Sequence, residues 1–555
     1  MNDSRSACPR SSCLLISLAI IAFGYVTGCG GGGSTAPPPT YAIGGTVINL
    51  VGTGGGLQLQ DDGHDSLLVN ANGAFTFPTP LASGTAYSVT VSVQPSAPAQ
   101  ICEVTHGTGT ATADVTSVAV DCGHMAWTWV GGSNLTGQVV TYGTEGTPAP
   151  GNIPGARGGG AAWIDASGNF WLFGGAGVPP QGTPFGAAPY GYLFNDLWKY
   201  SAGEWTWVSG SSQFNQAGAY GTEGTPAPGN IPGARQSSAI WIDASGNLWL
   251  FGGAGYDSSG LFFPNFSYLN DFWKYSGGQW TWMGGSNASQ GFPGHGGQGT
   301  YGTLGTPAPG NIPGGRLCAA TWVDKSGNLW LFGGFGYTTA GSVGDPLNDL
   351  WKYSAGQWTW MSGSNTPGQA AVYGTQGVPA PGNTPGAEEG VAAWTDASGN
   401  LWLFDGALWK YSAGQWTWVG GPQSNTKGVY GILATPAATN IPGARSGAAT
   451  WTDTAENFWL FGGYGVDSNG AAGNLNDLWK YSAGQWTWMG GSNVVNQNGT
   501  YGTLSIPSLA SIPGARASGA TWVDASGNFW LFGAGGSDSF GPQSQEYNDL
   551  WKYEP

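Results

Sequence analysis

The sequence predicts an all-β protein in which a small β-sandwich precedes a six-bladed β-propeller that is closed by an N-terminal outer strand. A segment ending in W-T-W recurs six times, at intervals of 58 to 78 residues. The chain carries 30 Trp, 22 Tyr and 22 Phe, an apolar load that a disordered chain has no reason to hold despite its 101 Gly and 35 Pro. No helical hydrophobic period appears, and short alternating segments are separated by turn residues.

Residues 1–28 are expected to be a signal peptide. Arg5 and Arg10 precede the apolar run 14–26, which is too short to span a bilayer comfortably. Val26-Thr27-Gly28-Cys29 resembles the lipobox of bacterial lipoproteins. The resemblance implies that Cys29 is lipidated, with a plain secretory cut or an N-terminal anchor as the alternatives.

Residues 29–40 read as a Gly- and Pro-rich tether that holds the following domain off a membrane. Gly30 follows the lipobox cysteine, and the sorting pattern of bacterial lipoproteins then implies the outer membrane or cell surface. The expected location is therefore the bacterial cell envelope, with the lipid as membrane contact.

Residues 41–123 are expected to form a small domain. Segments such as 73–81 and 86–94 alternate apolar and polar residues, as strands do. The pattern resembles the immunoglobulin-like or transthyretin-like β-sandwiches of bacterial surface proteins, which implies a spacer role. Cys102 and Cys122 are expected to form a disulfide in an oxidising compartment.

Residues 124–555 are periodic. Each unit reads G-A-R, an apolar strand, D-x-x-G-N, W-L-F-G-G, a variable loop, N-D-L-W-K-Y, S-A-G and W-T-W. That content is four strands, the size of one propeller blade.

The unit resembles the kelch repeat of the galactose-oxidase-like propellers, which is marked by a double glycine and a spaced aromatic pair. These marks are Gly174-Gly175 with Trp198 and Trp205 in the first unit, and they recur in the third. The resemblance implies six blades over 124–555. The last unit ends at Tyr553 after three strands, so the isolated W-T-W-V at 127–130 is expected to supply its fourth strand and leave no open sheet edge.

The recurring aromatic and acidic residues have structural and functional interpretations. Aromatics on both faces of each strand favour a core between blades over platforms for stacking sugars. The turn that begins at Asp165 could suggest calcium, but one Asp and one Asn provide too few ligands, and an Asp-capped hairpin with Gly explains the same letters. His64 and His106 lack a second cluster of ligands, so no metal is expected.

Every arginine after the signal peptide opens an inner strand of a unit. These residues are Arg157, Arg235, Arg316, Arg445 and Arg516. The fourth unit has Glu388 instead, and it also replaces the Asp of N-D-L-W-K-Y with Ala407. Loss of both partners favours an Arg–Asp pair that locks each blade. The second interpretation is a ring of guanidiniums at the channel mouth that captures an anionic ligand, as kelch arginines do for acidic peptides.

The fourth unit also lacks its variable loop, because Phe404-Asp405-Gly406 runs directly into Ala407. A notch is expected there on the loop-rich face, lined by Glu388, Glu389 and Asp405 and flanked by Arg316 and Arg445. Because binding residues tend to lie on loops over a rigid scaffold, this notch is the expected ligand entrance.

Composition and motifs restrict the function. The formal net charge of −16, with only 15 Lys and Arg, argues against nucleic acid as a partner. Galactose-oxidase-like copper chemistry needs a pair of histidines that His124 and His295 do not plausibly supply, so no cofactor is expected. The favoured prediction is a monomeric, surface-tethered module that binds a protein or polysaccharide. A carbohydrate-active enzyme resembling sialic-acid hydrolases or epimerases and a passive structural protein are the alternatives.

Overall fold

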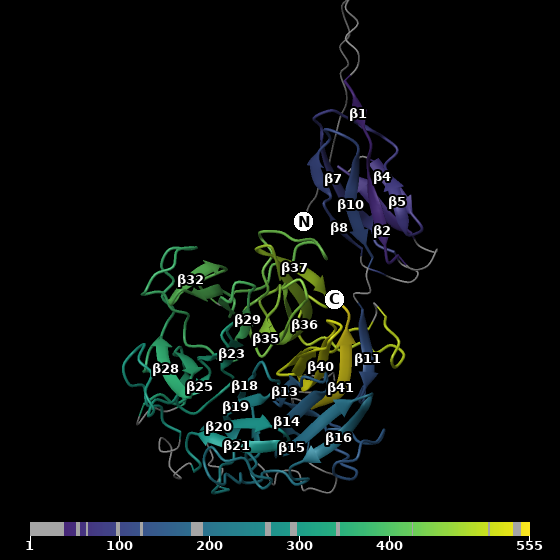
Figure 1. The fold of residues 1–555 in the computed structure, drawn as a ribbon. Helices are drawn as coiled ribbons and strands as arrows, with labels where there is room; N and C mark the ends of the chain where they lie inside the picture. Colours follow the sequence, from purple (N-terminus) through teal and green to yellow (C-terminus); the bar gives the residue numbers. More distant parts are fainter. Residues whose placement is uncertain are drawn as a thin grey trace, which may run out of the picture.

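The computed structural model describes residues 38–50, 56–62, 65–95, 100, 102–122, 126–178, 192–260, 268–288, 297–339, 344–424, 426–508, 511–536 and 545–555. The described chain is all-β and its sheets are almost entirely antiparallel, which fits a β-propeller with a further β-domain (Figure 1). The expected signal peptide, Cys29 and most of the tether lie outside these residues. So do His64, His124 and His295.

The N-terminal part contains two four-stranded sheets of order β5-β2-β10-β8 and β4-β3-β7-β9. A two-stranded sheet, β1 with β6, completes it. The strands are β1 Thr40–Tyr41, β2 Ile43–Ile48, β3 Leu57–Asp61, β4 Asp65–Val69, β5 Gly73–Thr76, β6 Leu81–Ala82, β7 Ala86–Val93, β8 Glu103–Thr105, β9 Thr108–Thr110 and β10 Val115–Asp121.

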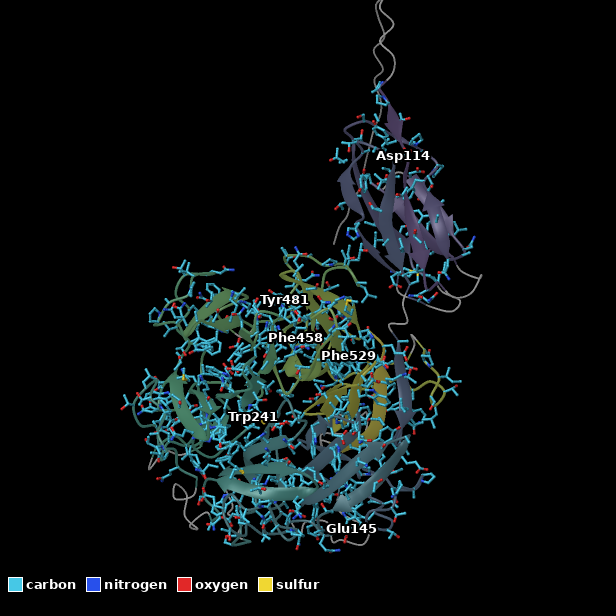
Figure 2. All side chains as sticks on the ribbon, in the orientation of Figure 1. Asp114, Glu145, Trp241, Phe458, Tyr481 and Phe529 are labelled. Atoms are coloured by element: carbon cyan, nitrogen blue, oxygen red, sulfur yellow. A yellow bond between two sulfur atoms is a disulfide. The ribbon has the colours of Figure 1, made fainter. Side chains whose placement is uncertain are left out.

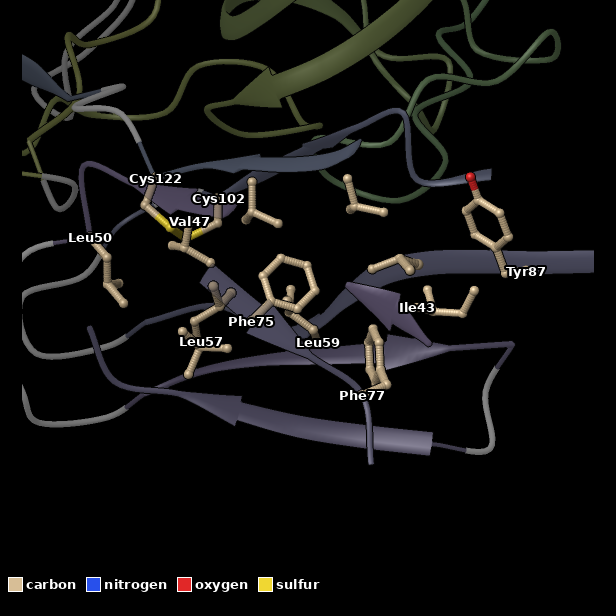
Figure 3. Close-up of a cluster of buried hydrophobic side chains, with 14 of the residues drawn as sticks. Ile43, Val47, Leu50, Leu57, Leu59, Phe75, Phe77, Tyr87, Cys102 and Cys122 are labelled. Atoms are coloured by element: carbon tan, nitrogen blue, oxygen red, sulfur yellow. A yellow bond between two sulfur atoms is a disulfide. The ribbon is translucent and has the colours of Figure 1, made fainter. Parts of the chain in front are cut away.

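Alternate residues of these strands point inward and form one hydrophobic cluster that both sheets share (Figure 3). Ile43, Leu57 and Leu59 are fully buried in this cluster. Cys102 and Cys122 lie at its edge and form a disulfide. Because so small a domain buries little apolar surface, the crosslink adds stability that the core alone lacks.

From Trp127 onward the sheets follow the sequence repeat, and each contains the strands of one unit. The first two units comprise β12 Arg157–Gly158, β13 Ala161–Ile164, β14 Phe170–Gly177, β15 Tyr192–Ser201, β16 Glu204–Ser209, β17 Arg235–Gln236, β18 Ala239–Ile242, β19 Leu248–Gly255, β20 Tyr268–Ser276 and β21 Gln279–Gly284. The third and fourth comprise β22 Arg316–Leu317, β23 Ala320–Val323, β24 Leu329–Phe332, β25 Phe335–Gly336, β26 Asp345–Pro346, β27 Leu350–Ser354, β28 Gln357–Ser362, β29 Ala392–Thr395, β30 Leu401–Phe404, β31 Leu408–Ser412 and β32 Gln415–Gly420. The last two comprise β33 Arg445–Ser446, β34 Ala449–Thr452, β35 Phe458–Val466, β36 Ala472–Ser482, β37 Gln485–Gly490, β38 Arg516–Ala517, β39 Ala520–Val523, β40 Phe529–Gly536 and β41 Gln545–Tyr553, joined by β11 Trp127–Gly131.

The inner strands of the units contact one another in a closed ring, in the order β13, β18, β23, β29, β34, β39 and back to β13. The last unit receives β11 as its outer strand, antiparallel to β41, with Trp127 opposite Tyr553 and Trp129 opposite Trp551. The isolated W-T-W-V therefore pairs with the C-terminal strand, as the sequence predicts, and leaves β41 no open edge.

Aromatic side chains pack between neighbouring units. Phe173 of the first unit lies 5.0 Å from Trp280 of the second, measured between ring centroids. Trp241 of the second unit packs against Trp358 of the third, and Trp241, Phe458 and Phe529 lie in the interior of the propeller region (Figure 2). These rings are buried and form the core between units, as the sequence predicts.

The D-x-x-G-N segments are hairpin turns. The Asp165 carboxylate accepts hydrogen bonds from the backbone N–H groups of Ser167 and Asn169, and from the side chains of Asn169 and Trp171. Burial alone would raise the pKa of Asp165, but these donors hold it below its usual value. All of its hydrogen-bonding capacity serves the turn, as expected for the structural interpretation.

Candidate functional site

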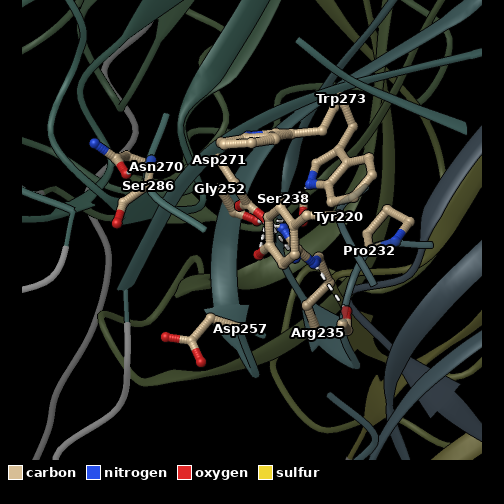
Figure 4. A network of polar contacts seen from close by, with 12 residues as sticks. Tyr220, Pro232, Arg235, Ser238, Gly252, Asp257, Asn270, Asp271, Trp273 and Ser286 are labelled. Atoms are coloured by element: carbon tan, nitrogen blue, oxygen red, sulfur yellow. Dashed lines mark hydrogen bonds and ion pairs between the residues drawn. The ribbon is translucent and has the colours of Figure 1, made fainter. Parts of the chain in front are cut away.

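Five of the units hold a buried ion pair of the same design, and the second unit illustrates it (Figure 4). Arg235 donates two hydrogen bonds to the Asp271 carboxylate, from Nη1 and from Nη2, each 2.7 Å long. It also donates from Nε to the Gly233 carbonyl and from Nη1 to the Gly252 carbonyl, at 2.9 and 3.0 Å. The guanidinium is thus bound on three sides by acceptors of its own unit.

Two further side chains donate hydrogen bonds to the Asp271 carboxylate. Tyr220 Oη and Trp273 Nε1 both donate to Oδ2 of Asp271, at 2.6 and 2.7 Å. Burial would lower the pKa of Arg235, but Asp271 keeps it above its ordinary value, so the guanidinium stays charged. The pair is fully satisfied, which is the condition under which a buried ion pair is tolerated.

The same network recurs in the first, third, fifth and sixth units. The five arginines are between 0% and 5% exposed, and every one faces its own aspartate. The expectation that Arg157, Arg235, Arg316, Arg445 and Arg516 contact a ligand is therefore corrected. Four of the five N–H donors of each guanidinium are bound inside its own blade, as the locking interpretation predicts.

The fourth unit lacks this network. Glu388 takes the arginine register, since its carbonyl lies against Gly333 as the Arg235 carbonyl lies against Gly174. Ala407 takes the aspartate register, two residues before the buried Trp409. Asp405 stands where the other units have the glycine that directly follows the W-L-F segment. Both members of the ion pair are thus replaced in one unit.

The connection between the second and third strands is also much shorter in this unit. In the third unit β25 and β26 stand between β24 and β27, whereas in the fourth unit only residues 405–407 join β30 to β31. Phe404 pairs directly with Leu408, and Ala407 donates its backbone N–H to the Asp405 carboxylate at 2.7 Å. The short hairpin leaves the inner end of the unit uncovered.

A cavity of about 410 Å³ opens at this place. Glu388, Asp405 and Tyr373 provide its ionisable lining, and Gln369 and Gln423 lie at its rim. The predicted notch therefore exists as a polar cavity, with two of its three expected acidic residues in the wall. The turns at 165–169 and 202–203 lie at the opposite ends of their strands, so the cavity is on the face of the long connections.

Burial changes the acidity of these groups. It raises the pKa of Asp405 to about 7, and the Glu388 carboxylate contributes in the same direction while the Ala407 N–H opposes it. Burial also raises the pKa of Glu388, with a contribution from Glu389, and that of Tyr373, with contributions from Asp405 and Glu388. The cavity therefore holds two interacting carboxyls, and the described residues of its wall include no Lys or Arg.

Three expected members of the site lie elsewhere. Glu389 is exposed and does not line the cavity; its charge acts on Tyr268 and Cys318. Arg316 and Arg445 stay within their own ion pairs. Burial raises the pKa of the Cys318 thiol to about 11, as expected for an inert core thiol.

Two residues of the site were not identified from the sequence. Tyr373 is the counterpart of Tyr142, Tyr220, Tyr301, Tyr430 and Tyr501, each of which donates to the aspartate of its unit. Trp409 is the counterpart of the tryptophan that donates to the same aspartate. The recurrence of a tyrosine before a glycine in every unit was the available signal.

Other features of the described residues give less support for a functional site than the cavity of the fourth unit does. A second cavity, about 300 Å³, lies among the inner strands and is lined by Trp163, Trp394, Trp451 and Trp522, without an ionisable group. Within the ranges described above, no group of three or more His, Cys, Asp and Glu is placed to hold a metal ion. A search of the same residues finds no helix with the length and hydrophobicity needed to span a membrane.

Comparison with known proteins gives structural likeness only. No family model matches the chain, and no curated protein matches it. The solved structure of YjhT covers 72% of this chain and 95% of its own at 14% identity, with a TM-score of 0.39. A copper complex of a fungal alcohol oxidase of the AA5 family covers 74% and 77% at 13% identity, with a TM-score of 0.35. A protein of unknown function from Dyadobacter fermentans covers 76% and 99% at 10% identity, with a TM-score of 0.38.

Proposed function

We propose that this protein is a binding module that holds a protein or polysaccharide ligand in the cavity of the fourth unit. One observation carries the proposal: the only unit without an Arg–Asp network in the described chain is also the unit whose covering loop is missing. Five units close this place with their own side chains, and the fourth leaves it polar and open. A concave polar site on the loop face of a rigid scaffold is a common setting for binding.

The proposal includes an architecture and a location. The chain forms a six-bladed kelch-type β-propeller carried by a small immunoglobulin-like or transthyretin-like β-sandwich. The ring of inner strands and the β11–β41 pairing support the propeller. A lipid on Cys29 holds the protein at the bacterial outer membrane or cell surface, with the loop face available to a ligand. The lipobox resemblance supports this location.

The test is binding of the full chain to arrays of glycans and of surface proteins. The cavity variant carries Glu388→Gln and Asp405→Asn, which keep the size of both side chains. Glu546→Gln is the matched control, because burial raises the pKa of Glu546 to about 7 as well, outside the cavity. We expect saturable binding that the cavity variant loses and the control keeps. Binding that survives in the cavity variant would place the ligand elsewhere and refute the proposal.

A carbohydrate-active enzyme is the second candidate. The observation that favours it is a pair of interacting carboxyls in one cavity, with the pKa of Asp405 raised to about 7 and a tyrosine beside them. Glycoside hydrolysis uses two carboxyls whose environments separate their acidities. Release of a labelled aglycone from oligosaccharides or sialosides, lost in Glu388→Gln, would support catalysis. Binding of the same sugars without turnover would leave the binding module alone.

A further inference from the structure

The other units show what the vacated place in the fourth unit is built to hold. In each of them a guanidinium lies between the carbonyl two residues before the arginine and the carbonyl of the first glycine of the pair. In the fourth unit Gly386 and Asp405 stand at these two registers, and both line the cavity. The sister glycines at the second register have φ between 61° and 65°, whereas Asp405 has no positive φ. The fourth unit therefore keeps the positions of the guanidinium seat without its own arginine, and at the second position it offers the Asp405 carboxyl.

The charge of the cavity fits the same group. Glu388 and Asp405 bring two carboxyls to the wall, whereas each sister unit brings one carboxylate and one arginine. Neither Lys nor Arg lines the cavity among the described residues. Two partly buried carboxyls without a counter-ion in the wall are costly when ionised, so a cation that entered would gain more than it would at an exposed site.

The buried hydrogen-bond network of the unit is incomplete as the chain stands. Trp409 is fully buried, and its Nε1–H has no acceptor among the residues that the structure describes. Its counterparts in the five other units all donate to the aspartate that also binds the arginine. Trp409 packs against Tyr373 with tilted rings, 5.0 Å between centroids, much as Trp351 packs against Tyr301 at 4.8 Å. The indole is therefore held as in the other units, beside a polar network that lacks its ionic members.

We infer that the cavity of the fourth unit binds the guanidinium of an arginine side chain that a partner protein inserts from the loop face. The missing loop between β30 and β31 gives the side chain its path. The inserted arginine takes the place that Arg316 and Arg445 occupy in the neighbouring units, with Glu388 and Asp405 as its carboxylates. This inference rests on the proposed function and names the partner as a protein with an exposed arginine.

The geometry distinguishes guanidinium from other cations. Guanidinium presents several N–H donors in one plane, which matches acceptors on two sides as in the sister units. A lysine ammonium or the amine of an amino sugar carries the charge without that plane. Citrulline keeps the shape of arginine and loses the charge. These three groups therefore separate shape from charge in a binding experiment.

The experiment measures binding of blocked Gly-Arg-Gly, Gly-Lys-Gly and Gly-citrulline-Gly peptides to the full chain by calorimetry at pH 8. We expect saturable binding of the arginine peptide, with the lysine peptide weaker and the citrulline peptide at least tenfold weaker. The variant with Glu388→Gln and Asp405→Asn should lose at least tenfold in affinity, and Glu546→Gln should keep the original affinity. A second variant, Glu388→Arg with Ala407→Asp, supplies the missing pair in cis and should block the peptide while the protein stays folded.

Each result has a separate meaning. Equal binding of arginine and citrulline, or no binding of arginine, overturns the inference. If arginine fails but the array ligand is still lost in the cavity variant, the proposed function stands without the arginine. Binding of glucosamine oligomers in place of the arginine peptide, measured at a pH below the pKa of their amines, would assign the cation to a polysaccharide and refute the protein partner. If neither array binding nor peptide binding depends on the cavity, both proposals fail.

Discussion

The third and fourth units differ at one place although their strands pair in the same register. In the third unit Arg316 and Asp349 form a bidentate pair at 2.6 and 2.8 Å, and β22, which carries Arg316, is in one sheet with β25 and β26. In the fourth unit the corresponding positions hold Glu388 and Ala407, the covering strands are missing, and a cavity takes their place. The outer strands β28 and β32 nevertheless pair with β27 and β31 through the same sequence of partners.

The difference shows that the ion pair does not determine the fold of a unit. The fourth unit keeps its four main strands, its Asp396 turn and its aromatic core without the pair. The pair is therefore a local means of filling polar space at the inner end of each blade. Where that filling is absent, the space becomes available to a ligand.

The largest expected effect concerns closure of the ring of units. The comparison of the fourth unit with the others assumes that each of the others has all of its strands. The sixth unit is complete only through β11, whose Trp127 packs against Phe461 and Tyr553. Deleting residues 126–131 from the full chain should abolish the cooperative unfolding of the propeller or cause aggregation, since it removes an outer strand and exposes the edge of β41. Thermal unfolding followed by light scattering tests this. An unchanged transition would show that the ring closes without β11.

The second expected effect compares how much the arginine register contributes to stability in a unit that has the ion pair and in the unit that lacks it. Arg316→Ala should lower the free energy of unfolding by about 3–5 kcal/mol, because it leaves the Asp349 carboxylate buried without its partner. Glu388→Ala, at the same register in the next unit, should change it by less than about 1 kcal/mol. Urea unfolding at pH 7 measures both. Similar losses in the two variants would mean that Glu388 has a structural role as large as that of an arginine.

The third expected effect concerns the folding stability that is lost when the carboxyls of the cavity ionise, and it depends on pH. Burial raises the pKa of Asp405 to about 7 in the folded chain, whereas an unfolded Asp titrates near its model value of 3.8. Between these values the folded state retains the proton more tightly, so stability should fall as pH rises from about 4 to about 7. Glu388 faces Asp405, has a raised pKa and acts in the same direction, while Tyr373 stays neutral in this range.

Asp405→Asn should therefore stabilise the protein by roughly 1–3 kcal/mol at pH 8, and by much less at pH 4. The amide retains an oxygen that can accept the Ala407 N–H. Urea unfolding at the two pH values measures the difference. A variant less stable than the original at pH 8 would mean that the carboxylate already has a favourable partner in the unliganded protein.

Much of this arrangement could be predicted from the sequence, and the limits have physical causes. The loss of Arg and Asp from one unit together predicts that they pair, and the junction of Phe404-Asp405-Gly406 with Ala407 predicts the notch. Which way the guanidiniums face could not be read, because strand alternation alone does not separate the interior of a blade from the channel mouth. Tyr373 and Trp409 belong to the site through a three-dimensional network, so their roles appear only when the equivalent contacts of the other units are seen.

The smallest effect compares two equivalent indoles. Trp351→Phe removes a hydrogen bond to the buried Asp349 carboxylate, whereas Trp409→Phe removes an N–H that has no acceptor. Both side chains are fully buried, so the loss of volume is matched and cancels in the comparison. Trp351→Phe should therefore cost about 1–2 kcal/mol more than Trp409→Phe in urea unfolding. Equal costs would mean that Trp409 finds a partner in solution, such as a bound water, and that the polar network of the fourth unit is already complete without a ligand.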